Sequence, residues 1–127
     1  IELLVVIAII GILSTVGVVT YSNYVKGTKR TAAESAMQQI SLAQTEEYSN
    51  SGEYFVQVET DSCTPSSDTS DDIMTKLFGG ADIINDNMGF EMCIAAVGSS
   101  YVVVASEGGG KCTIKMTGNG AWTRELC

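Results

Sequence analysis

Hydrophobic residues are concentrated at the start of the chain. Leu3–Val19 carries no charge and is interrupted by polar side chains at Ser14 and Thr15. A helix of this length spans about 25 Å, and with residues 20–25 added it crosses a bilayer core. The segment lacks the basic start and small-residue cleavage site of a signal peptide, and it is too apolar all round for the remaining chain to bury. We therefore expect residues 1–25 to form a transmembrane helix.

After Val25 the pattern changes to that of an amphipathic helix. Apolar side chains recur every three to four residues, as on one packed helix face. These residues are Ala33, Ala36, Met37, Ile40 and Ala43. The opposite face is polar and consists of Lys29, Arg30, Glu34, Gln38, Gln39 and Glu46. Gly52 suits a C-terminal cap, so we predict one helix from Ile1 to about Asn50, roughly 75 Å long. A compact domain needs no such rod, but a filament subunit does, because copies or lipid bury its apolar half.

The remaining chain is divided by turn residues into short elements. Glu53–Val58 is expected to be a short strand or extended turn, and Thr60–Asp72 a polar loop rich in Ser and Asp. Ile73–Phe78 is predicted to be a short helix that is capped by Ser70 or Asp71 and ends before Gly79.

Four strands are predicted in the last third of the chain. They are Phe90–Val97, Tyr101–Ser106, Lys111–Thr117 and Ala121–Leu126, separated by turns at 98–100, 107–110 and 118–120. Alternation within Lys111–Thr117 indicates one packed face and one solvated face. The predicted fold class is α+β, with an antiparallel β-meander packed on the second half of the long helix. We divide the chain into a transmembrane or filament-core helix (1–25), its amphipathic continuation (26–52) and a globular head (53–127).

Charge is distributed as unevenly as hydrophobicity. The chain has 7 Lys and Arg residues against 15 Asp and Glu residues, and its net charge is −8. Three basic residues, Lys26, Lys29 and Arg30, directly follow the apolar segment, and the chain from Thr31 onward carries a net −10. Such a surface repels phosphate backbones, so we expect no nucleic acid on the head. The sequence has no histidine, which weakens any case for a histidine-based enzyme.

The four cysteines, Cys63, Cys93, Cys112 and Cys127, all follow the apolar segment. Their spacing lacks the paired C-x-x-C motifs of zinc sites and favours two disulfides in an oxidising compartment. Four cysteines allow three pairings. A turn at Gly118–Gly120 brings Cys112 near the chain end, so we predict Cys112–Cys127 and, by exclusion, Cys63–Cys93.

No motif indicates catalysis or a bound cofactor. Asp82–Gly89 superficially resembles a calcium loop but lacks an acidic or amide residue at its third position, and a plain Asn/Asp turn is the better interpretation. The Ser and Asp residues of 60–72 have no base for a catalytic triad. We expect no catalytic residues, no metal site and no cofactor.

The run Ile1–Leu13, IELLVVIAIIGIL, resembles the start of mature type IV pilins and of the pseudopilins of type II secretion. The family's mature chains usually begin Phe-Thr-Leu, just before the position of Ile1, after a prepilin peptidase removes a basic leader. These residues are expected to precede Ile1. The resemblance implies that Glu2 serves filament assembly by neutralising the N-terminal amine of a neighbouring subunit. Many members have proline, and a locally unwound helix, where this chain has Val19.

The resemblance implies a structural protein, the major subunit of a type IV pilus for adhesion, motility or uptake. Its partners are copies of itself in a helical homopolymer, the pilus assembly machinery, and the bacterial inner membrane before assembly; afterwards it is extracellular. The positive-inside rule would put Lys26, Lys29 and Arg30 in the cytoplasm, but the disulfides and the resemblance favour a head outside it. The alternatives are a major pseudopilin of a type II secretion system and a minor adhesion or DNA-uptake pilin.

Overall fold

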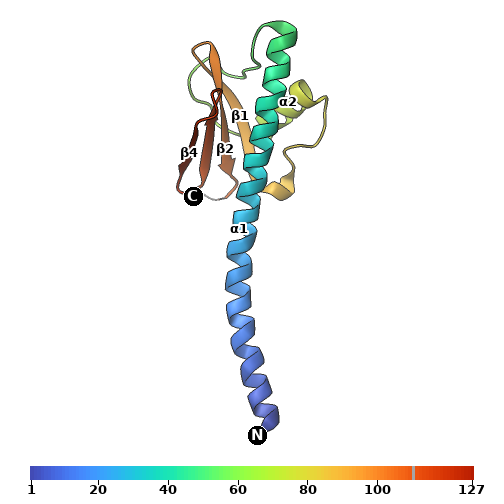
Figure 1. The fold of residues 1–127 in the computed structure, drawn as a ribbon, viewed down its shortest axis with the longest axis vertical. Helices are drawn as coiled ribbons and strands as arrows, with labels where there is room; N and C mark the ends of the chain where they lie inside the picture. Colours follow the sequence, from blue (N-terminus) through green and yellow to red (C-terminus); the bar gives the residue numbers. More distant parts are fainter. Residues whose placement is uncertain (110) are drawn as a thin grey trace.

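A long helical rod carries a small sheet on its C-terminal half (Figure 1). The computed structural model describes residues 1–109 and 111–127, and the side chains of Val19, Ser22 and Asp86 lie outside that description. Helix α1 runs unbroken over Glu2–Ser51. It ends at Gly52, whose φ of 83° is left-handed and whose N–H donates to the Tyr48 carbonyl at 2.8 Å. The predicted long helix and its glycine cap are confirmed.

Helix α2 (Ser67–Phe78) begins earlier than the sequence predicts. The prediction that Ser70 or Asp71 caps it is wrong, because the N-cap is Ser66. The Ser66 N–H donates to the Thr69 hydroxyl at 2.8 Å, and the Thr69 N–H donates to the Ser66 hydroxyl at 3.2 Å. This reciprocal pair satisfies two of the N–H groups that a helix start leaves free, so the helix includes part of the expected polar loop.

The sheet is a four-stranded antiparallel meander with strand order β1-β2-β3-β4. Its strands are β1 (Phe90–Val97), β2 (Ser100–Glu107), β3 (Thr113–Thr117) and β4 (Trp122–Glu125). The predicted turn at 118–120 joins β3 to β4, with the Gly120 N–H donating to the Thr117 carbonyl at 2.9 Å. The predicted turn at 107–110 includes Gly110, which lies outside the described residues. The α+β fold predicted from the sequence is confirmed.

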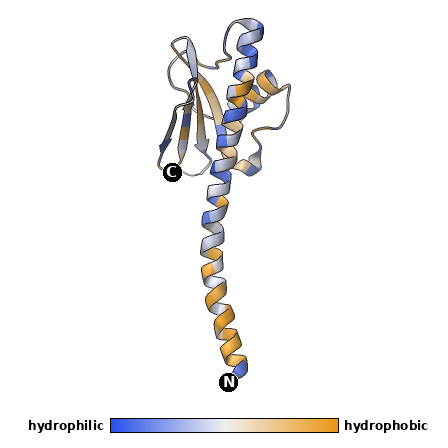
Figure 2. Ribbon diagram, in the orientation of Figure 1, coloured by the Kyte–Doolittle hydropathy of each residue, from blue (hydrophilic) through white to orange (hydrophobic). Residues whose placement is uncertain are grey.

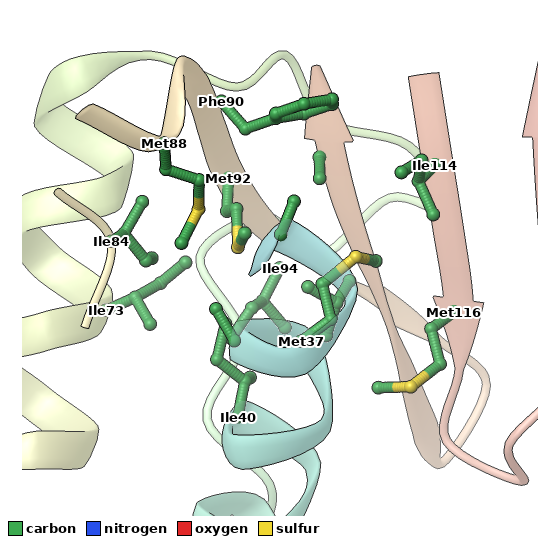
Figure 3. Close-up of a cluster of buried hydrophobic side chains, with 14 of the residues drawn as sticks. Met37, Ile40, Ile73, Ile84, Met88, Phe90, Met92, Ile94, Ile114 and Met116 are labelled. Atoms are coloured by element: carbon green, nitrogen blue, oxygen red, sulfur yellow. The ribbon is translucent and has the colours of Figure 1, made fainter. Parts of the chain in front are cut away.

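The core lies between the sheet and α1 (Figure 3). The strand alternation predicted for β3 is confirmed, because Ile114 and Met116 are buried while Thr113, Lys115 and Thr117 are half-buried. The buried apolar side chains that α1 contributes, among those described, are Ala33, Ala36, Met37 and Ile40. Ala43, predicted on the same face, is only half-buried.

The free edge of β1 is covered by the segment that follows α1. The Gln57 N–H donates to the Ile94 carbonyl at 2.9 Å, and the Gln57 side-chain oxygen accepts from the Ile94 N–H at 3.0 Å. The segment 53–58, expected to be a short strand or extended turn, forms no strand among the described residues and makes a single parallel bridge, between Val58 and Ala95. Farther along the same edge, Ser70 of α2 accepts from the Met92 N–H at 2.9 Å. Side chains thus replace a fifth strand and leave little of this edge open for pairing.

Candidate assembly surface

The first half of α1 projects from the head with nothing packed against it (Figure 2). Every described side chain from Ile1 to Tyr24 is exposed, including Leu3 at 73% and Ile9 at 51%. The most apolar window of α1 has a mean hydropathy of 2.7, and none of it is buried. By length and composition, this helix is sufficient to cross a membrane.

Exposure of this segment to water is unfavourable. Burying one Val, Leu or Ile side chain stabilises by about 1.5–3 kcal/mol, so covering a dozen of them contributes on the order of 20 kcal/mol. Hydrophobic residues also follow one another along this half of the rod (Figure 2), unlike the scattered apolar residues of ordinary soluble surfaces. The segment therefore needs a covering of lipid or of other protein chains.

The polar groups within this half are satisfied inside the helix. The Ser14 hydroxyl donates to the Ile10 carbonyl at 2.7 Å, and the Thr15 hydroxyl donates to the Gly11 carbonyl at 3.0 Å. Space around Gly11 and Gly17 is open, since an added Cβ would meet nothing within 4 Å. Satisfied hydroxyls and open glycines both favour close contact with lipid or with another helix.

Glu2 lies in the first turn of α1, at the end of the rod farthest from the head (Figure 1). A carboxylate there is favoured by the positive end of the helix dipole. The first basic side chain along the chain is Lys26, about 36 Å away on a straight helix. A basic side chain that pairs with Glu2 therefore cannot come from the same helix.

The base of the head contains an ion pair that the sequence pattern does not reveal. Arg124 of β4 donates to Oε1 of Glu34 on α1 through Nε and Nη2, both at 2.6 Å. The hydrogen bond to Glu34, and the attraction of its charge, raise the pKa of Arg124. The prediction that Glu34 lies on a polar outer face is wrong, because the Glu34 side chain is only 25% exposed. The two residues are too far apart in sequence for periodicity to relate them.

Gln44 is a second position that the sequence pattern missed. It is fully buried on the face of α1 that packs on the head. Its amide nitrogen donates to the Phe55 carbonyl at 2.6 Å, and its amide oxygen accepts from the Phe55 N–H at 2.8 Å. Gln44 lies four residues after the buried Ile40, so the apolar spacing continued to this position would have indicated burial.

Two disulfides close the head. Cys63 and Cys93 are bonded with their Cα atoms 6.3 Å apart, and Cys112 and Cys127 with their Cα atoms 4.5 Å apart. These are the two pairs that the sequence predicts. The first bond joins the segment before α2 to β1, and the second joins the chain end to the residue preceding β3. Both therefore stabilise the head rather than the rod.

The 82–89 segment forms a turn that contains a short 3₁₀ helix, Asp86–Met88. The Asn85 side-chain oxygen accepts from the Met88 N–H at 3.1 Å, which is the ordinary role of Asn in a turn. Among the side chains that the structure describes, which do not include that of Asp86, no three His, Cys, Asp or Glu residues are grouped to hold a metal ion.

Protein-family models, curated proteins and solved structures were compared with this chain, and none matches it.

Proposed function

We propose that this protein is the major subunit of a type IV pilus, a structural protein whose copies polymerise into a helical filament. The observation that carries the proposal is the contrast between the two halves of α1. One half is packed in a head closed by two disulfides, and the other is apolar and bare. An anchor for a single head explains the apolar half only while lipid surrounds it. A filament subunit uses the same surface twice, in the inner membrane and then in the filament core.

Glu2 has the central role in this proposal. Hydrophobic burial draws apolar helices together but does not fix how far one slides along another. A carboxylate among aliphatic side chains fixes that position, because only a neighbour that supplies a cation avoids a buried, unpaired charge. In the proposed filament this cation is the N-terminal amine of a neighbouring mature subunit.

The other candidate functions have less support than a major pilin. A major pseudopilin of a type II secretion system would have the same architecture. The presence of filaments on the cell surface distinguishes a major pilin from such a pseudopilin. A minor DNA-uptake pilin would need a basic head, whereas this head carries a net negative charge.

The experiment is to shear filaments from the surface of the source cell, identify their main protein and compare a strain lacking this gene. We expect this chain to be the main filament protein, and we expect the deletion strain to have no surface filaments. Filaments that persist unchanged without the gene would refute the proposal. Loss of a secreted enzyme, with no surface filaments in either strain, would favour the pseudopilin.

A further inference from the structure

A cleft lies at the tip of the head, where α1 ends beside the β1–β2 turn. It is open, has a volume of about 690 Å³, and is lined by Tyr48, Tyr54, Glu53, Glu59 and the 98–100 turn. Glu53 and Glu59 are both exposed. Among the side chains that the structure describes, the one ion pair joins Glu34 and Arg124, so Glu53 and Glu59 have no basic partner in the described part of the chain.

The aromatic wall of the cleft is firmly held. Tyr48 stacks on Tyr54 with ring centroids 4.7 Å apart, and Tyr54 packs at 4.9 Å against Tyr101. Tyr101 is buried, and its hydroxyl donates to Ser41 of α1 at 3.1 Å. Tyrosine rings attract a cation through their faces, and carboxylates attract it through charge. The chemistry of the cleft therefore suits a lysine or arginine side chain.

This chain carries such side chains at the opposite end of its head. Lys26 and Lys29 are exposed on the part of α1 that precedes its buried residues, which begin at Ala33, while the cleft lies where α1 ends. Lys29 and Glu53 are 24 residues apart, which is about 36 Å along a straight helix. The two surfaces cannot meet within one molecule. They can meet between two copies displaced along the rod by about the height of one head.

We propose that the tip cleft of one copy binds Lys26 and Lys29 of the next copy, head to tail. This inference rests on the proposed filament function and adds to it a second assembly contact, on the heads. A contact between two different surfaces of the same chain repeats without closing, as a filament requires. It also brings opposite charges together on heads that are otherwise strongly acidic and repel one another.

The most direct test treats isolated filaments with a carbodiimide, which couples an amine to a carboxylate only where the two touch. Peptide mapping should then find Lys26 or Lys29 joined to Glu53 or Glu59. Lys29 and Glu53 are 24 residues apart, about 36 Å along a straight helix, and Lys26 lies farther still, so a bond from either lysine to Glu53 must join two copies. Filaments that give other lysine–carboxylate bonds but none of these would overturn the inference and leave the proposed function standing.

A charge exchange tests the same contact in cells. Glu53→Lys with Glu59→Lys should lower the filament yield on the order of tenfold, as should Lys26→Glu with Lys29→Glu. Combining all four changes should restore most of the yield. The matched control, Asp71→Lys with Asp82→Lys, reverses two exposed carboxylates outside the cleft and should leave the yield near that of the unaltered chain.

Two results of the exchange would overturn the inference. One is a combined variant no better than either pair of changes. The other is a lysine variant that inserts poorly in the membrane while the cleft variant assembles normally, which would assign Lys26 and Lys29 to lipid headgroups instead. A failure of the unaltered chain to form filaments would remove the proposed function itself, and the inference with it.

Discussion

Arg124 and Glu34 form an ion pair that fastens the outermost strand of the sheet to the long helix. The Arg124 guanidinium donates twice to one carboxylate oxygen of Glu34, with both distances 2.6 Å. Glu34 lies one residue after the buried Ala33, and Arg124 pairs with Ile114 across β3 and β4. The pair therefore joins the edge strand to the part of α1 that enters the core.

Replacing Glu34 by Gln should loosen β4 without unfolding the head. The pair is half-exposed and screened by salt, so the loss in overall stability is small. Amide hydrogen exchange in β4 should become faster, whereas a Glu46→Gln control should leave it unchanged. Glu34 raises the pKa of Arg124. The contribution of this pair to the stability of the folded state is therefore complete below the usual arginine pKa and is lost only in strongly alkaline solution. Identical β4 exchange in the Glu34→Gln variant and the unaltered chain would show that the pair does not hold the strand.

Replacing Gln44 by Leu should destabilise the head much more. Leucine leaves the N–H and carbonyl of Phe55 without the partners that Gln44 supplies, at a cost of about 0.5–1.5 kcal/mol for each of these part-buried hydrogen bonds. Gln39→Leu is the matched control, because Gln39 is exposed on the same helix. Denaturant unfolding of the full chain in detergent micelles should show a large shift for Gln44→Leu and almost none for Gln39→Leu. Equal shifts would contradict the role of Gln44.

Peptide mapping without reduction should recover Cys63 with Cys93 and Cys112 with Cys127. Recovery of Cys93 with Cys112 would reject this pairing. The second bond closes a loop with a sequence separation of 15 and the first one of 30, so opening either should cost about 3–4 kcal/mol in the chain-entropy model. Cys112→Ser with Cys127→Ser should therefore lower the unfolding midpoint, with β3 and β4 affected first.

The stretch from Ser14 to Thr20 should lose helix in the filament although it is helical in the isolated chain. The sequence STVGVVT is roughly 4 kcal/mol worse than alanine in helix propensity. Lipid enforces the helix because unpaired backbone groups have no other partner there, and the filament removes that lipid. A filament map should show a break in helical density in this stretch. Continuous helical density from Leu3 to Tyr48 would contradict the prediction.

Local patterns were enough to predict most of the fold. The spacing of Ala33, Met37 and Ile40 marked the packed helix face, and the alternation around Ile114 marked the packed sheet face. Helix α2 begins earlier than predicted because Ser66 caps it together with Thr69, which stands where the usual capping box has Glu or Gln.

The contacts that join distant segments were not predictable in the same way. No local sequence pattern marks Gln57. Its hydrogen bond to Ile94 exists because β1 is the edge strand of the sheet and the segment that contains Gln57 lies beside it. Glu34 and Arg124 are both ordinary surface charges until the sheet folds onto the helix. The candidate assembly surface could be identified from the sequence, because Glu2 and the apolar run are visible there, and the structure adds that these side chains are exposed.

The measurement that tests the central claim most directly is the replacement of Glu2 by Val in cells that carry no other copy of the gene. A carboxylate costs about 3 kcal/mol in hydrocarbon, so valine cannot weaken membrane insertion through hydrophobicity. Membrane fractions should therefore contain as much of the variant as of the unaltered chain, while surface filaments disappear. Glu2→Asp, which keeps a carboxylate, should retain part of the filament yield. Abundant filaments of normal length from the Glu2→Val strain would show that the carboxylate does not guide assembly.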